Sequence, residues 1–290
     1  MNAKRAAKPG RAGWFLIGGG VLYLIGFLFL PLAAVFVEAF AKGAGHFWET
    51  LLHSETKDAI LLTLLSVAVA VPLNLVFGVM AAWALTRFEF RGKQVLITLI
   101  DLPFSVSPIV AGLVLILVYG QNGLFGGWLE SHGLKIIFAK PGVILATIFV
   151  TLPFVVRELI PLMQSQGRDD EEAALTLGAN GWQIFRLVTL PNIKWGLIYG
   201  VILCNARAMG EFGAASVVSG FIRAETVTLP LQIDILFNEY NAAGAFACAC
   251  LLALGALATL LLKSVVERRS EADRNLSSAG LQTISVERNS

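Results

Sequence analysis

The 290-residue chain is 56% hydrophobic and only 14% charged, and its formal net charge at pH 7 is +2. Several apolar runs exceed the roughly 18 residues that indicate a membrane helix, so the composition excludes an ordinary soluble domain. Nucleic-acid binding is excluded as well, because no basic face exists outside the segments between the apolar runs.

Six apolar runs are long enough to cross a membrane, and together they predict an all-α integral membrane protein. The predicted spans are about 14–40, 59–85, 95–119, 142–163, 195–219 and 242–262. A basic polar segment, residues 1–13, precedes them, and residues 270–290 form a polar tail that we expect to be disordered. The first run is longer than the roughly 7–15 apolar residues of a signal peptide, so we expect it to remain uncleaved despite Ala39–Phe40–Ala41, which resembles a cleavage site.

Some spans contain prolines, and the segments between spans are polar or rich in glycine. Pro103 and Pro108 predict a kinked third span. We expect residues 41–58, 120–141 and 220–241 to form loops on one side of the membrane.

The distribution of Lys and Arg gives the orientation of the chain in the membrane. Fifteen of these residues lie in the amino-terminal segment, the second-to-third loop, the fourth-to-fifth loop and the tail, whereas five lie in the loops on the opposite side. Because the cytoplasmic side carries the positive excess, both termini and residues 164–191 are expected in the cytoplasm.

The loop over 164–191 contains start and stop signals for two short helices. Asp169 or Asp170 can cap the first helix, and the following acidic residues suit its first turn. Gly178 suits the left-handed residue after that helix. Asn180 and Gln183 predict a capping box for a second helix, and Pro191 is expected to mark its end. Both helices are too short to span a bilayer, which favours a docking element for another protein over a surface connector.

Five polar residues inside the predicted spans are candidates for a translocation path, because buried charges and amides in a membrane face protein or water by default. They are Asn74, Asp101, Asn205, Arg207 and Glu211. Arg207 and Glu211 are four residues apart and can pair on one helical face, so they either line the path of an anion or only fix helix packing. Asp101 is expected to hold a helix break.

Catalytic and metal-binding signatures are absent from the sequence. It contains no G-x-x-x-x-G-K-[ST], and Gly92–Lys93–Gln94 is part of a basic loop, so another subunit must bind ATP and Mg²⁺ if the work is ATP-driven. Cys204, Cys248 and Cys250 lie inside apolar runs and are interpreted as small buried residues. No catalytic residue, metal ligand or bound cofactor is therefore predicted for this chain.

The loop resembles the EAA loop of ABC importer permeases, in which coupling helices sit in a groove of a cytoplasmic ATPase. The matching residues are Glu172, Ala173, Ala174, Gly178, Leu190 and Pro191, with Val188 where isoleucine is usual. The resemblance implies the type I permease fold, with six transmembrane helices, cytoplasmic coupling helices and a permease domain over residues 59–263. It also implies that the loop contacts the ATPase subunits.

Three further stretches resemble the sulfate/thiosulfate permeases, and most closely their W-type subunit. They are Asp101–Val110, Val150–Leu159 and Asn205–Ala214. This resemblance implies a complex with a paralogous T-type permease, two ATPase subunits and a periplasmic sulfate-binding protein at the inner membrane. Molybdate permeases share the loop and have related fifth-span patterns, so another oxyanion remains an alternative.

Two other classes of protein compete with this interpretation. A secondary transporter should contain an internally repeated half, which the sequence does not show, and it needs no docking loop. A membrane scaffold would have the same loop without transporting a substrate, and ATPase activity that responds to a binding protein would separate the two.

Overall fold

The computed structural model describes the backbone of residues 10–287 and the side chains of residues 13–268. The helices are α1 (Arg11–Leu24), η1 (Ile25–Phe29), α2 (Leu30–Ala39), α3 (Gly43–Leu52), α4 (Ser54–Arg87), α5 (Lys93–Ser105), α6 (Pro108–Tyr119), α7 (Gly126–Ser131), α8 (Lys140–Gln166), α9 (Asp169–Thr176), α10 (Gly181–Ile184), η2 (Phe185–Thr189), α11 (Leu190–Met209), α12 (Gly213–Ser219), α13 (Leu229–Asn238) and α14 (Ala242–Glu287). Most of the expected basic segment, residues 1–13, lies outside the described residues.

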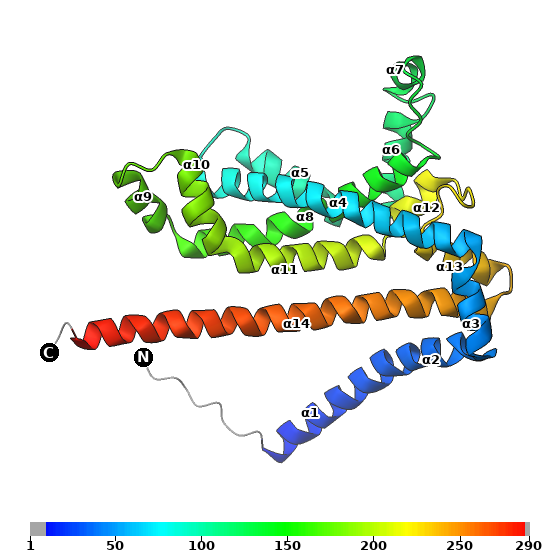
Figure 1. Cartoon of the computed structure of the whole chain (residues 1–290), viewed down its shortest axis with the longest axis horizontal. Helices are drawn as coiled ribbons and strands as arrows, with labels where there is room; N and C mark the ends of the chain where they lie inside the picture. Colours follow the sequence, from blue (N-terminus) through cyan, green and yellow to red (C-terminus); the bar gives the residue numbers. More distant parts are fainter. Residues whose placement is uncertain (1–9, 288–290) are drawn as a thin grey trace.

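Five helical segments of the described chain are long and apolar enough to cross a membrane, and a bent pair, α5 and α6, brings the number to six. Figure 1 shows α4, α8, α11 and α14 extending along the same direction. The helices α9 and α10 lie at one end of this bundle, and α3, α7, α12 and α13 lie at the opposite end. The start of α1 and the end of α14 point toward the end that carries α9 and α10.

The centre of the bundle is the contact of α4, α8 and α11. Val155, Leu159 and Met163 of α8 are completely buried there. Gly78 of α4 permits the close approach, because a Cβ atom at this position would lie 2.6 Å from Cγ1 of Val155. Small residues at such contacts let membrane helices pack backbone to backbone.

The third predicted span is broken, not merely kinked. The chain bends by 115° between α5 and α6, at Val106 and Ser107. Pro108 begins α6, and a proline disfavours helical geometry in the residue before it, so two helices replace one. α6 packs instead against α12, where a Cβ atom on Gly112 would lie 2.9 Å from the carbonyl oxygen of Ala214.

The fifth predicted span is also broken. α11 ends at Met209, and α12 resumes at Gly213 after a short non-helical link. The prediction of one continuous helix over 195–219 is therefore wrong at residues 210–212. The sequence explains the break, because glycine is the weakest helix former after proline and Gly210 and Gly213 flank the link.

The second helix of the cytoplasmic loop does not end at Pro191, contrary to the prediction. α10, η2 and α11 form one helical segment, Gly181–Met209. Pro191 lies in the first turn of α11, where its missing N–H is tolerated, and the wider π turn of η2 precedes it. The docking helix is thus continuous with the fifth span.

Segments expected to be irregular contain further helices. α3 lies within 41–58, α7 lies within 120–141, and α13 lies within 220–241. α14 continues as helix to Glu287, which differs from the disorder expected for residues 270–290. That stretch contains no proline to stop the helix. Residues 288–290 lie outside the described residues.

Candidate functional site

The loop between the fourth and fifth spans begins with α9, which ends in a glycine-dependent turn. Gly178 has a φ of +88°, as the sequence predicts. The Ala179 N–H donates to the Ala174 carbonyl at 3.1 Å, and the Gly178 N–H donates to the Leu175 carbonyl at 3.0 Å. This pair of bonds is a Schellman motif, in which the left-handed residue allows the helix to end and the chain to reverse. Gly178 therefore fixes the geometry between α9 and α10.

The start of α10 confirms the predicted capping box. The Gln183 N–H donates to Oδ1 of Asn180 at 2.9 Å, and the Asn180 N–H donates to Oε1 of Gln183 at 2.8 Å. The start of α9 differs from the prediction, because Arg168 occupies the N-cap position and no side chain caps the helix. Asp169 and Asp170 instead belong to its first turn, where negative charge is favoured.

An ion pair that the sequence did not reveal holds the loop against the membrane helices. Nε of Arg87 lies 2.7 Å from Oε2 of Glu171, and the exposed fractions of the Arg87 and Glu171 side chains are 9% and 16%. The Thr189 hydroxyl donates to the other oxygen of Glu171 at 2.7 Å. Arg168 adds a bond to the Thr86 carbonyl at 2.9 Å. The Glu171 carboxylate thus joins α4, α9 and η2. In the sequence, the basic Arg87 at the end of the second predicted span was the feature that could have pointed to this ion pair.

The loop presents an apolar surface at its tip. Its largest exposed side chains are Leu175, Leu177, Trp182 and Leu187, which are 62–88% exposed. Glu172 and Ala173 are exposed beside them, and Ala174 is half-buried. Exposed apolar side chains that gather on one face mark a protein contact surface. We call these four side chains, with Glu172 and Ala173, the loop tip.

The tip is fixed to the membrane helices by aromatic side chains. The Trp182 ring stacks on Phe185 at 5.7 Å between centroids, and Phe185 packs edge-on against Trp83 at 6.0 Å. Such pairs stabilise packing beyond the area that they bury. A force applied at Trp182 therefore reaches α4 and α11 through packed side chains.

Arg207 and Glu211 do form the predicted pair, but at the break between α11 and α12. Nη1 of Arg207 lies 2.8 Å from Oε2 of Glu211, and the Arg207 side chain is 32% exposed whereas that of Glu211 is 2% exposed. The Ala214 N–H donates to Oε1 of Glu211 at 2.8 Å. The carboxylate therefore satisfies the first turn of α12 as well as the guanidinium, and the arginine keeps a face that other groups can approach.

The other three candidate path residues do not join this pair by any hydrogen bond or ion pair among the described side chains. Asn74 is buried and donates to the Thr151 hydroxyl at 2.7 Å and to the Ile148 carbonyl at 3.1 Å. Asp101 pairs with Arg157 at 2.8 Å between α5 and α8. Asn205 contacts Sδ of Met209, one turn further along α11. Asn74 thus fastens α4 to α8.

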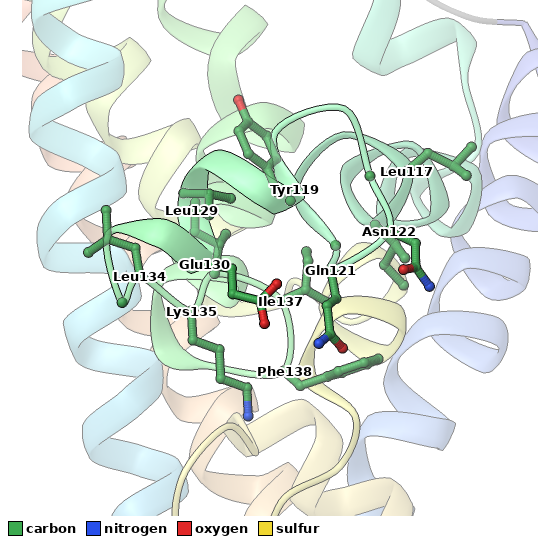
Figure 2. A pocket seen from close by; sticks show the side chains of 16 residues that line it. Leu117, Tyr119, Gln121, Asn122, Leu129, Glu130, Leu134, Lys135, Ile137 and Phe138 are labelled. Atoms are coloured by element: carbon green, nitrogen blue, oxygen red, sulfur yellow. The ribbon is translucent and has the colours of Figure 1, made fainter.

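The opposite end of the molecule carries an ion cluster and a cavity. Arg223 pairs with Glu239 and, at 2.9 Å, with Glu55, so that these carboxylates raise the pKa of the guanidinium. Figure 2 shows the cavity, of about 630 Å³, between the end of α6, α7 and the segment before α8. Glu130 and Lys135 are among its polar lining residues. The side opposite the loop tip thus has a recess and fixed charges.

The cysteines are buried and free, as the sequence predicts. Among the described residues, no group of three or more His, Cys, Asp or Glu side chains is arranged to hold a metal ion.

A family model described as "Binding-protein-dependent transport system inner membrane component" matches residues 74–271. The match includes the loop tip, the helix breaks at both ends of α12 and most of α14. It begins within α4 and therefore leaves α1, α2 and α3 outside.

Relatives cover nearly the whole chain. The sulfate transport system permease protein CysW of Escherichia coli K12 is 57% identical over 266 residues, which are 91% of this chain and 91% of the relative. The sulfate transport system permease protein CysT of the same strain is 36% identical and covers 90% of this chain and 93% of its own length. A chain of a bacterial alginate ABC transporter has a TM-score of 0.74 at 19% identity, with 88% and 93% of the two chains covered.

Proposed function

Because the chain belongs to the family of binding-protein-dependent transport system inner membrane components, we propose that it moves sulfate and thiosulfate across the bacterial inner membrane. It is a multi-pass permease component of an ABC transporter and not itself the ATPase. The observation that carries the substrate assignment is the 57% identity to a sulfate permease over 91% of both chains.

The proposed complex contains this chain, a T-type permease, two ATPase subunits and a periplasmic sulfate-binding protein. The 36% identity to a CysT protein supports a paralogous permease partner, since a W-type and a T-type chain are related but distinct. The ATPase contacts the loop tip, whose exposed Leu177 and Trp182 fit an apolar groove. The binding protein approaches the opposite end, with its cavity and ion cluster.

The proposed orientation places both termini in the cytoplasm with the loop tip. The Lys and Arg excess of fifteen to five supports it. Figure 1 also supports it, because the start of α1 and the end of α14 lie toward the end of the bundle that carries α9 and α10.

We further propose that Arg207 faces the path of the anion. Its guanidinium is partly neutralised by Glu211, so it provides moderate positive potential, and an unpaired arginine would hold a divalent oxyanion too tightly for release. The binding protein selects the anion, and this face lowers the barrier to its passage. Asn205 lies two residues before Arg207 on α11; Asp101 and Asn74 have structural partners and rank behind it.

The test is uptake of isotopically labelled sulfate by a deletion strain that is complemented with this chain. We expect restored uptake that thiosulfate inhibits strongly and molybdate only weakly. Restored molybdate uptake with little sulfate uptake would support the alternative, a molybdate permease. No restored uptake of either anion, with normal abundance of the chain in the membrane, would contradict the proposal.

A further inference from the structure

A second site lies on the cytoplasmic half of the bundle, apart from the loop tip and from Arg207. It is a cavity of about 580 Å³ between α8, α11 and α14, and we call it the α8–α11–α14 groove. Its lining includes Glu158, Trp195, Gly196, Tyr199 and Glu267. Cavities of about 300–1,000 Å³ are the usual size for small-molecule sites.

The groove contains a carboxylate, Glu158, to which no described side chain is hydrogen-bonded or ion-paired. Glu158 is half-buried inside the apolar segment of α8, eight residues before the helix ends at Gln166. At 1.5 Å per residue it lies about 12 Å from that end. Within the described residues, neither a hydrogen bond nor an ion pair reaches its side chain, although Lys263 is close enough to interact electrostatically. An ionisable side chain inside a span without a partner points to a ligand.

The opposite wall of the groove supplies positive charge and an aromatic surface. Nζ of Lys263 lies 5.1 Å from the centre of the Tyr199 ring and 3.8 Å from Oε1 of Glu267. Tyr199 and Trp195 are the side chains that membrane proteins place at the level of the lipid headgroups. The groove thus combines the Glu158 carboxylate and aromatic walls with an ammonium group, that of Lys263, beside its lining.

The charges of the groove decide which ligand it fits. Glu158 and Glu267 outnumber Lys263, so a dianion such as sulfate and an anionic lipid headgroup are both disfavoured there. A zwitterionic headgroup matches the presence of both signs, with its ammonium on Glu158 and its phosphate on Lys263. A primary ammonium can donate three hydrogen bonds to a carboxylate and to nearby polar side chains, whereas a quaternary ammonium donates none.

We propose that the α8–α11–α14 groove binds a zwitterionic phospholipid with a primary ammonium headgroup, of the phosphatidylethanolamine type, from the cytoplasmic leaflet. The acyl chains lie on the apolar outer face of α14, where Leu257, Leu260 and Leu261 are exposed. The bound lipid fills the space between α14 and the core helices α8 and α11, and it neutralises Glu158. The site is independent of which anion the permease transports.

The test is native mass spectrometry of the purified complex, after detergent exchange in the presence of phosphatidylethanolamine, phosphatidylcholine or phosphatidylglycerol. The wild type should retain phosphatidylethanolamine about tenfold more than either other lipid. Glu158→Gln should remove this preference, and Lys263→Gln should weaken retention of all lipids that carry phosphate. The matched control is Glu130→Gln, which removes a carboxylate from the cavity at the opposite end.

A photo-crosslinking residue in place of Tyr199 supplies a readout that does not depend on variants of Glu158. We expect a lipid adduct in native membranes. An adduct with the permease partner would overturn the proposal, because a protein helix would then cover the groove. Equal retention of the three lipids by the wild type would overturn it too, as would unchanged preference in a well-folded Glu158→Gln complex.

Discussion

Two adjacent glutamates at the start of α9 lie in different surroundings. Glu171 is largely buried against Arg87 and Thr189, whereas Glu172, the first residue of the EAA match, is exposed at the loop tip. The resemblance implies that the loop, with Glu172 among its matching residues, contacts the ATPase. The structure gives the anchoring contacts to Glu171, which leaves Glu172 available for a partner.

Replacing Glu171 and Glu172 one at a time distinguishes a residue that holds the loop against the membrane helices from a residue that contacts the ATPase. Glu171→Ala leaves Arg87 buried without its carboxylate, and breaking such a pair costs about 3–5 kcal/mol. We expect a lower thermal midpoint of the detergent-purified chain and weaker ATPase copurification. Glu172→Ala should lower copurification without moving the midpoint. Equal midpoints for the two variants would show that Glu171 does not hold the loop.

The four-residue spacing of Arg207 and Glu211 predicted that they form a pair. The sequence did not reveal that α11 ends between them, so that Glu211 also holds the start of α12. Glu211 forms an ion pair with Arg207 and accepts a hydrogen bond from the Ala214 N–H, so it also has a structural function at the start of α12. Arg207 is the member of the pair with an accessible face.

A cycle of Arg207→Ala, Glu211→Gln and the double variant distinguishes the two functions of the pair. Arg207→Ala leaves a buried carboxylate unpaired and should lower membrane abundance. The double variant should assemble, because the introduced glutamine keeps an oxygen for the Ala214 N–H, yet its sulfate uptake should fall at least tenfold. Near-normal uptake by a well-assembled double variant would leave the pair with a packing function only.

At the scale of helices, the positions of the spans could be predicted from apolar runs, but the breaks within them could not. The runs 95–119 and 195–219 are apolar apart from a few polar residues such as Asp101, Arg207 and Glu211, and hydropathy does not distinguish one straight helix from two at an angle. In the structure, Pro108 begins the second helix of the third span, and Gly112 of that helix packs against α12.

At Pro191 the sequence predicted a helix end, whereas the structure has a continuous helix. A proline usually ends a helix before it, but here the π turn Phe185–Thr189 removes the need for its missing N–H. The loop and the fifth span are therefore one rigid unit from Gly181 to Met209, and the Arg207–Glu211 pair lies at its far end. Movement of the ATPase at the loop tip can reach that pair without crossing a flexible joint.

The turn between α9 and α10 provides a matched pair of glycines. A Cβ atom would meet nothing within 4 Å at Gly178 or at Gly181, but only Gly178 has a left-handed backbone. Gly178→Val should cost about 1–3 kcal/mol of backbone strain and should weaken ATPase copurification and uptake, while the chain stays in the membrane. Gly181→Val should have little effect. If both variants copurify with the ATPase as well as the wild type, the turn is not the coupling element.

For the whole molecule, the two ends of the bundle differ in charge and in shape. The loop tip lies at one end, and the cavity beside α7 and the Arg223 cluster lie at the other. The basic excess could be counted from the sequence. The cavity could not, because its lining comes from the end of α6, α7 and the segment before α8, which only the folded chain brings around one space.

Reporter fusions test the proposed orientation. Fusions at Gly45, Gly127 and Asn238, in or at the end of α3, α7 and α13, should report the periplasm. Fusions at Gly92, Arg168 and Arg274 should report the cytoplasm. A cytoplasmic signal at Asn238 would mean that α11 with α12, or α14, does not cross the membrane.

The central claim is that this chain carries sulfate through an ATP-driven complex, and reconstitution into liposomes tests it most directly. The complex is placed in vesicles with labelled sulfate and binding protein on the outer face of the permease and ATP on the side of the loop tip. We predict that sulfate accumulates only when both ATP and the binding protein are present. Accumulation without the ATPase subunits would indicate a secondary transporter, and ATP hydrolysis stimulated by the binding protein without any sulfate movement would contradict a transport function.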